Sequence, residues 1–347
     1  MPSPDLSGPQ GRRLRVLVTG AGGAAAVAFL RDLEDRVDLI AADLDPYAAG
    51  LYLVPPTRRE LLPRGDAPEF TTALLAACVR HKVDVLVPTV DVELAPISRR
   101  VADFAQHGVR VLVESPATLA RTLDKATLVR VCAGAVRVPH TRVLDHGLDD
   151  GALAAAGLTG AVVVKPRRGA GGREVAQVTA PAGLADLPRD GSMIVQELLP
   201  GAEWSLDVLA GPGRVVAVVP RRRDKVDSGI AVAARTVSDP ALEDFGKRVA
   251  RAVGLRWVAN VQCRADSAGR PALLEVNPRF PGTMPLTVQA GVDLPAWALH
   301  DLLGRLLPTS LAYRDIAVVR YWAERYVPVS EVDDLLRRGE QRVAVPA

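Results

Sequence analysis

Three polar residues at two-residue spacing end an apolar segment late in the chain. Glu275, Asn277 and Arg279 in LLEVNPR would share one face of a strand, because alternate side chains of a strand point the same way. An acid, an amide and a cation on one face are costly to bury without a partner. The spacing therefore predicts a polar ligand beyond this face, with an ion-paired strand end as the alternative.

Two lysines and a glycine-rich segment offer positive charge upstream. Lys165 ends the apolar segment AVVVK, and Gly169, Gly171 and Gly172 follow it. A lysine at the end of a buried strand needs an anion, and a glycine hairpin can fold its N–H groups over phosphates. With Lys125, these residues could neutralise a triphosphate; two solvated lysines beside a turn are the alternative. The chain lacks G-x-x-x-x-G-K-[ST], so it is not a P-loop protein.

An earlier glycine-rich segment, GAGGAA at 20–25, matches G-x-G-x-x-A between a predicted strand and a predicted helix. Asp43 ends the next predicted strand, where a ribose-binding acid would lie. The pattern is compatible with an NAD(P)-dependent oxidoreductase built on the Gly20 loop, which we keep as an alternative function. A tight strand-to-helix turn also requires glycine, and we favour that interpretation.

The elements that must position these residues differ along the chain. Residues 14–115 alternate strands with helices, including one helix over 94–108, and this predicts a Rossmann-like parallel sheet. From 116 to 310 the strands become antiparallel in type, which predicts an α+β domain. We expect a disordered lead-in over 1–13. The extension over 311–347 should hold a strand at 315–327 and a short helix near 332–338.

Composition restricts the class of protein. The chain is 48% hydrophobic and 24% charged with a net charge of +3, as expected of a globular domain. It has no basic stripe with interleaved aromatics, no apolar run of about 20 residues and no signal peptide, so neither nucleic acid nor membrane is an expected partner. Cys78, Cys132 and Cys263 fit neither a disulfide framework nor a metal cluster, and we expect a cytoplasmic protein.

Taken in chain order, these motifs resemble the ATP-grasp superfamily, in its carbamoyl-phosphate-synthase-like branch. The likeness covers roughly residues 14–310. It rests on Asp124-Lys125, on Lys165-Pro166 with the glycines that follow, and on the segments VQELLPGAEWSLDV, ANVQC and LLEVNPR. The resemblance implies a Rossmann-like pre-ATP-grasp domain over 14–115. It also implies a two-lobed ATP-grasp domain over 116–310, with a lid subdomain at about 125–195.

The resemblance also implies roles for individual residues. Phosphate contacts would come from Lys125, Lys165 and the glycines at 169, 171 and 172, the adenine hinge from Glu197, Leu198 and Leu199, and the ribose contact from Glu203. The metal set, for Mg²⁺ or alternatively Mn²⁺, would be Gln262, Glu275 and Asn277. Arg279, Lys165 and Asn277 would form the catalytic group. Many members of the family have a second carboxylate where Gln262 stands.

The implied reaction is that of a carboxylate–amine ligase, in which a carboxylate takes the γ-phosphoryl group of ATP and an amine then displaces phosphate. The predicted loop at 220–229 offers Arg221, Arg222, Arg223, Ser228 and Gly229 to a substrate carboxylate, although a solvated basic loop is an equal alternative. Asp91 and Glu93 follow a strand and could hold the ammonium group of an amino acid. Alternatively, they are acids that complement a helix N-terminus.

The expected partners are therefore a small-molecule carboxylate and an amine. A homodimer stays open, because members of the family are often dimers. A non-catalytic ATP-binding protein is the remaining alternative.

Overall fold

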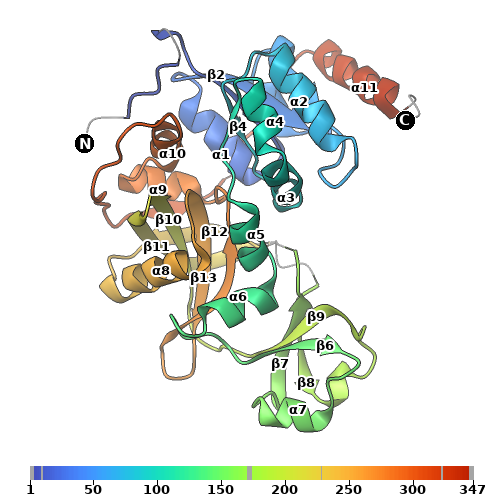
Figure 1. The fold of residues 1–347 in the computed structure, drawn as a ribbon, viewed down its shortest axis with the longest axis vertical. Helices are drawn as coiled ribbons and strands as arrows, with labels where there is room; N and C mark the ends of the chain where they lie inside the picture. The colour runs from blue at the N-terminus through green and yellow to red at the C-terminus, as the bar shows by residue number, and fades with distance from the viewer. Residues whose placement is uncertain (1–3, 9–10, 170–173, 228, 322, 344–347) are drawn as a thin grey trace.

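Three β-sheets organise the chain in the computed structural model, which describes residues 4–8, 11–169, 174–227, 229–321 and 323–343. Figure 1 shows them stacked along the long axis, with a five-stranded sheet at one end, a six-stranded sheet in the middle and a four-stranded sheet at the other end. The predicted mixture of α/β and α+β architecture is confirmed. None of the described helices is long and apolar enough to cross a bilayer.

The N-terminal sheet is parallel, with strand order β3-β2-β1-β4-β5. Its strands consist mainly of buried aliphatic residues, as expected where helices cover both faces of a sheet. The strands are β1 (Arg15–Val18), β2 (Asp38–Asp43), β3 (Arg59–Leu61), β4 (Val85–Val87) and β5 (Arg110–Val111). The helical segments are α1 (Ala24–Leu33), η2 (Ala49–Leu53), η3 (Pro56–Arg58), α2 (Phe70–Arg80), α3 (Asp91–Arg99) and α4 (Val101–Gln106).

The single helix predicted over 94–108 is wrong, because α3 ends at Arg99 and α4 begins at Val101. Arg100 leaves the helical region with φ −115° and ψ 16°. Its guanidinium donates to the carboxylate of Asp103 and to the hydroxyl of Thr71 on α2. The break therefore lets both short helices pack on the sheet.

The middle sheet is antiparallel, with order β14-β13-β10-β11-β12-β15. One face packs against α8, which Asp239 caps at its start and Gly254, with φ 73°, terminates. The strands are β10 (Glu203–Gly211), β11 (Arg214–Asp227), β12 (Ile230–Thr236), β13 (Val258–Ala265), β14 (Pro271–Asn277) and β15 (Ala317–Val319). The helices are α8 (Pro240–Val253), α9 (Met284–Ala290) and α10 (Leu294–Leu302).

The four-stranded sheet has order β6-β9-β7-β8 and its own apolar core under α7. Its elements are β6 (Thr141–Asp145), α7 (Asp150–Ala155), β7 (Gly160–Pro166), β8 (Ala176–Ala180), η4 (Ala182–Leu184) and β9 (Asp190–Glu197). The helices α5 (Pro116–Thr122) and α6 (Lys125–Cys132) precede it along the chain and lie between it and the N-terminal sheet in Figure 1.

The N-terminal and middle sheets are tied by a buried carboxylate. Glu114 accepts hydrogen bonds from the backbone N–H groups of Arg256, at 3.0 Å, and Trp257, at 2.8 Å. The guanidinium of Arg256 pairs with Asp301 at 2.5 Å and stacks over the Trp257 ring. Burial raises the pKa of Glu114 to about 7, and the hydrogen bonds from residues 256 and 257 oppose that shift. The hydrogen bonds of Glu114 therefore fix how the two sheets join, while burial of its carboxylate opposes the charged form.

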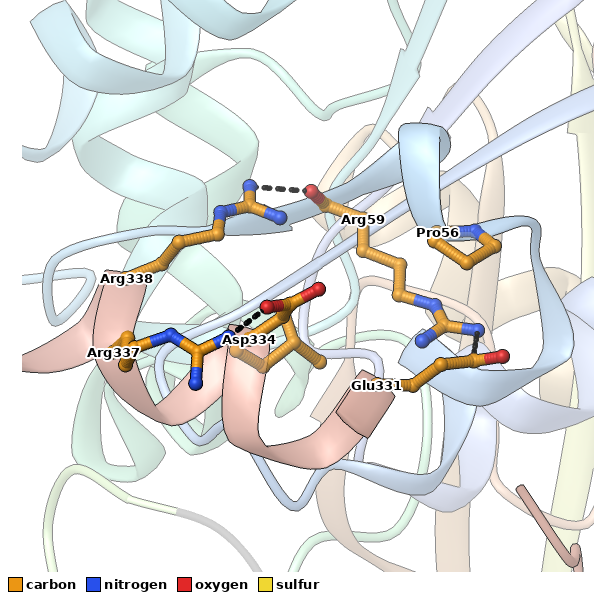
Figure 2. Close-up of a pocket in the computed structure, with 7 residues that line it drawn as sticks. Pro56, Arg59, Glu331, Asp334, Arg337 and Arg338 are labelled. Carbon is orange, nitrogen blue, oxygen red and sulfur yellow. Dashed lines mark hydrogen bonds and ion pairs between the residues drawn. The ribbon is translucent and has the colours of Figure 1, made fainter. Parts of the chain in front are cut away.

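The C-terminal segment returns to the N-terminal sheet. The strand predicted over 315–327 is much shorter in the structure, where β15 spans only Ala317–Val319. The backbone N–H of Arg320 donates the last hydrogen bond of this ladder to the Val232 carbonyl, near the start of β12. The helix predicted at 332–338 is the longer α11 (Val329–Val343), which lies beside the N-terminal domain in Figure 1. Figure 2 shows its contact with β3, where Arg59 pairs with Glu331 at 2.7 Å and Arg338 donates to the Arg59 carbonyl.

A cavity of about 210 Å³ lies at this contact between α11 and the N-terminal domain. Its acidic and basic side chains largely neutralise one another, because Glu331 pairs with Arg59 and Asp334 pairs with Arg337 (Figure 2). None of the predicted site residues lines it. We therefore assign this cavity to the packing of α11 and not to the functional site.

Candidate functional site

The face of the middle sheet that points away from α8 carries the predicted ligand-binding side chains. Strand register places Gln262 opposite Glu275, and Asn260 opposite Asn277. We call this surface the polar face, defined by the side chains of Glu203, Ser205, Asp207, Arg221, Arg223, Asn260, Gln262, Glu275 and Asn277. The opposite face of the same strands is apolar and packs on α8. Period-two alternation therefore separates a core face from a site face.

Glu275 and Asn277 are adjacent on the polar face, as their spacing predicts. The amide of Asn277 donates to Glu275 Oε1 at 3.0 Å, and Lys125 Nζ lies 3.9 Å from Glu275 Oε2. Asn277 is 9% exposed, so these groups are largely removed from bulk water. The structure thus brings a residue from α6 to residues about 150 positions later in the chain.

Lys125 and Lys165 are both buried, each with 7% exposure. Lys125 Nζ donates to the Gly169 carbonyl at 2.6 Å, and its backbone N–H donates to the Arg167 carbonyl at 3.0 Å. Burial lowers the pKa of Lys165 to about 8; the nearby carboxylates of Glu275 and Glu203 oppose the shift, and the ammonium of Lys125 adds to it. Two ammonium groups in one dry region are unfavourable without an anion.

Arg223, one of the three arginines expected to face a substrate carboxylate, contacts protein groups of the polar face in the structure. It forms an ion pair with Glu203 and donates to Gln262 Oε1 at 3.2 Å and to the Gly229 carbonyl at 2.8 Å. Glu203, predicted as the ribose contact, is therefore paired with a guanidinium. The amide of Gln262 in turn donates to Asn260 Oδ1 at 3.2 Å. The alternation of Arg221 and Arg223 on one face of a strand, with residue 222 on the other, is the signal that could have placed Arg223 on the polar face.

The predicted adenine hinge lies at the end of β9. The carboxylate of Glu197 accepts two hydrogen bonds from Arg137, both at 2.7 Å, and one from the His140 N–H at 3.0 Å. Its side chain and its backbone N–H, which donates to the His140 carbonyl at 2.9 Å, are therefore engaged by the protein. The predicted contact with adenine would fall to the backbone of Leu198 and Leu199. Leu199 is buried and Leu198 is partly buried.

Arg279 extends from the turn after β14 to the N-terminal domain. Its guanidinium forms a bidentate pair with Asp91, at 2.8 and 2.9 Å, across 188 residues of sequence. Asp91 begins α3, so its predicted alternative as an acid at a helix N-terminus holds, and its carboxylate is not open to an ammonium group. Burial opposes the charge of Arg279, but the carboxylate of Asp91 more than compensates and the pKa of the guanidinium is raised.

Glu93 is 8% exposed and accepts a hydrogen bond from the hydroxyl of Thr19. Burial raises the pKa of Glu93 to about 7, with the hydroxyl of Thr19 opposing the shift. A carboxyl that is half neutral near pH 7 and already occupied is a poor receptor for an ammonium group. In the structure Glu93 therefore joins α3 to Thr19, the residue that follows β1.

The segment at 220–229 is not an exposed basic loop, because β11 continues through Asp227. Arg221 is fully buried and pairs with Asp207 at 2.5 Å, whereas Arg222 is exposed and lies 3.4 Å from Asp224. The two arginines point to opposite faces of β11, so they cannot both contact one substrate carboxylate. Gly229 lies in the turn before β12 with φ 77°.

Three predicted site residues, Gly171, Gly172 and Ser228, lie outside the described residues. The earlier glycine-rich loop is a tight turn, as favoured above. Gly20 has φ 63°, and the Asp43 carboxylate accepts from the Gly22 N–H at 2.7 Å. In the structure the carboxylate of Asp43, at the end of β2, therefore holds the glycine-rich loop in place.

Two family models match the chain. Residues 16–112 match a model described as the PylC-like N-terminal domain, and residues 189–324 match one described as ATP-grasp in the biosynthetic pathway with the Ter operon. Comparison with curated proteins found no match.

Solved structures with the same fold include three enzymes of low sequence identity. The biotin carboxylase–β,γ-ATP complex from Campylobacter jejuni has a TM-score of 0.70 at 17% identity, over 87% of this chain and 74% of that chain. The N5-carboxyaminoimidazole synthetase from Staphylococcus aureus, complexed with ADP, has a TM-score of 0.70 at 13% identity, over 95% and 86%. The L-amino acid ligase from Bacillus licheniformis has a TM-score of 0.66 at 15% identity, over 85% and 75%.

Proposed function

The chain belongs to the ATP-grasp superfamily, and from this premise we propose that it is an ATP- and Mg²⁺-dependent carboxylate–amine ligase with an amino acid as one substrate. The observation that carries the proposal is the convergence of two buried lysines on the Glu275–Asn277 pair. These groups come from α6, β7 and β14, which lie far apart in the sequence. The triphosphate of ATP would balance the two lysines, and its metal would bind Glu275 and an amide oxygen.

The donor set fits a magnesium ion that is shared with phosphates. Glu275 would supply a carboxylate and Asn277 an amide oxygen, which are the hard ligands that Mg²⁺ prefers. The amide oxygen of Gln262 accepts from Arg223 in the structure and would have to turn from it to reach the metal. Among the described residues no group of three or more His, Cys, Asp or Glu residues could hold a metal alone. The metal would therefore depend on ATP oxygens for the rest of its shell. When bound, it supplies charge neutralisation for phosphoryl transfer.

The residues of the chain then act by position and charge. Lys125 and Lys165 hold the phosphates, and Arg279, aimed by Asp91, steadies the transferred group. An oxygen of the substrate carboxylate attacks the γ-phosphorus, and the bond to the bridging oxygen breaks to release ADP. The amine nitrogen then attacks the acyl carbon, phosphate leaves, and the nitrogen loses a proton. The protein supplies no covalent nucleophile in this scheme.

The choice of an amino acid rests on the fold shared with the L-amino acid ligase from Bacillus licheniformis. The oxidoreductase alternative has less support, because the Gly20 loop is held by the carboxylate that would bind ribose. A non-catalytic ATP-binding protein would share the same lysines and metal ligands, and only turnover separates it from a ligase.

The decisive experiment is a screen of L-amino acid pairs for ATP-dependent phosphate release, with and without Mg²⁺. We expect at least one pair to release phosphate and ADP in equal amounts, and Lys165→Met to abolish the release. ATP binding without release from any pair would support the non-catalytic alternative. Oxidation of NADH or NADPH without any ATP binding would instead support the oxidoreductase.

A further inference from the structure

Three guanidinium groups meet at the turn that follows β14. Arg279 at its start is paired with Asp91. Arg221 is paired with Asp207 and donates to the hydroxyl of Thr283 at the end of the turn. Arg320 donates to the Gly282 carbonyl. Two of the three cations have a carboxylate partner; among the described residues, none lies within ion-pair distance of Arg320.

Strand register places Arg320 on the polar face. Val318 on β15 lies opposite Ala234 on β12, and Ala234 lies opposite Arg223 on β11. Arg320 is two residues beyond Val318, so it shares the face of Arg223. It therefore lies at the β15 edge of the surface that carries Glu275 at the β14 edge.

The positive charge of Arg320 is destabilised by its surroundings in the structure. The side chain is half-buried, and burial lowers the pKa of its guanidinium, with the nearby charge of Arg221 adding to the shift. A guanidinium has five N–H donors, and the Gly282 carbonyl accepts from one nitrogen. The remaining donors can form a fork that matches a carboxylate. A half-buried cation of this kind is stabilised by an anionic ligand.

The turn also brings this cation to the N-terminal domain. A Cβ placed on Gly282 would lie 3.0 Å from the Cβ of Ala24 in the first turn of α1. Arg320 thus lies where β15, the Arg279 turn and the N-terminal domain meet. A small substrate held here would be close to the turn that carries Arg279.

We propose that Arg320 binds a carboxylate group of the amino acid substrate, and this inference rests on the ligase function proposed above. The carboxylate it holds differs from the one that is phosphorylated, because the phosphate-binding lysines lie with Glu275 at the other edge of the polar face. It belongs either to the amine substrate or to a second acidic group on the acid substrate. An amino acid whose carboxylate is converted to an amide would lose this contact.

The test compares Arg320→Ala and Arg320→Lys with the wild type and with Arg314→Ala. Arg314 is a matched control, because it lies on the same segment and its guanidinium also donates to a backbone carbonyl, that of Gln289 at 3.1 Å, while its side chain is exposed. Each protein is saturated with Mg²⁺ and AMPPNP and titrated with the twenty L-amino acids and their amides. Thermal stabilisation reports binding without requiring turnover.

We expect at least one amino acid to stabilise the wild type at a concentration at least about 10-fold below that of its amide. Arg320→Ala should bind that acid and its amide alike, at the weak level of the amide. The preference for the acid over its amide should be intermediate in Arg320→Lys, and Arg314→Ala should show the preference of the wild type. In an active pair, only the KM of the member held by Arg320 should rise in Arg320→Ala, which identifies the source of the carboxylate.

Equal binding of acid and amide by the wild type, or unchanged acid binding by Arg320→Ala, would overturn the inference. A purely structural role would weaken acid and amide equally and would also overturn it. If Arg320→Ala does not fold, the same comparison in Arg320→Lys decides. Amino acid binding through Arg320 without phosphate release from any pair would refute the proposed ligase function and leave the inference about Arg320 standing.

Discussion

We predict that the lowered pKa of Lys165, as a proposed phosphate contact, makes nucleotide binding sensitive to alkaline pH. The protein without nucleotide holds this lysine with a pKa of about 8, mainly because it is buried. A bound triphosphate interacts with the charged form only. The lysine is therefore ready to bind below its pKa, and the contribution is lost as the pH rises through about 8. A single site of this kind weakens binding about 10-fold at pH 9 relative to pH 7.

The assay is the Kd of Mg-ADP, measured by calorimetry from pH 7 to 9.5 at constant ionic strength. Lys165→Met should bind about 10- to 100-fold more weakly at pH 7, as for loss of a charge-assisted contact, and should show no alkaline decline. Lys247→Met is the control, because Lys247 lies on α8 and pairs with Glu243 at 3.7 Å, away from the polar face. A Kd that stays flat to pH 9.5 in the wild type, with the protein still folded, would refute the reasoning.

Three further outcomes follow from the charges of the fold. Asp207→Ala leaves Arg221 buried without its carboxylate, and Asn260 and Thr287 without their acceptor, and should destabilise the protein by about 3–5 kcal/mol in urea unfolding; a loss below about 1 kcal/mol would contradict the pairing. The pKa of Glu114 rises from 4.5 to about 7 on folding, so stability should fall as the pH rises from 5 to 7, by up to about 3 kcal/mol, and Glu114→Gln should flatten that slope in thermal melts. Glu275→Gln should raise the Mg²⁺ concentration for half-maximal phosphate release by about 10-fold or more, and an unchanged value would remove Glu275 from the metal set.

Local patterns in the sequence predict much of the fold. Buried aliphatic strands alternating with helices indicate the parallel sheet, and the polar spacing of Glu275 and Asn277 indicates the site face. Both rest on the geometry of a single strand or helix, which the chain encodes over a few residues. The break at Arg100 was missed because it depends on side-chain contacts with Thr71 on another helix.

The partners of the site residues could not be predicted in the same way. The pair between Asp91 and Arg279 joins residues from different domains, and nothing near either residue indicates the other. Arg221 and Arg222 are neighbours in a basic segment, which suggested a loop. The strand instead separates them, with one fully buried and one exposed. Such pairings follow from tertiary packing, which overrides local composition.

The pairing of charges on the polar face also defines what the site can bind. Arg223 is balanced by Glu203, Arg221 by Asp207 and Arg279 by Asp91. These pairs need no ligand and hold the strands and the turn in place. The lysines near Glu275 carry two positive charges against one carboxylate within ion-pair distance, and Arg320 has none among the described residues. A ligand that completes the site must therefore bring negative charge to both edges of the sheet, which a nucleotide triphosphate and a substrate carboxylate do together.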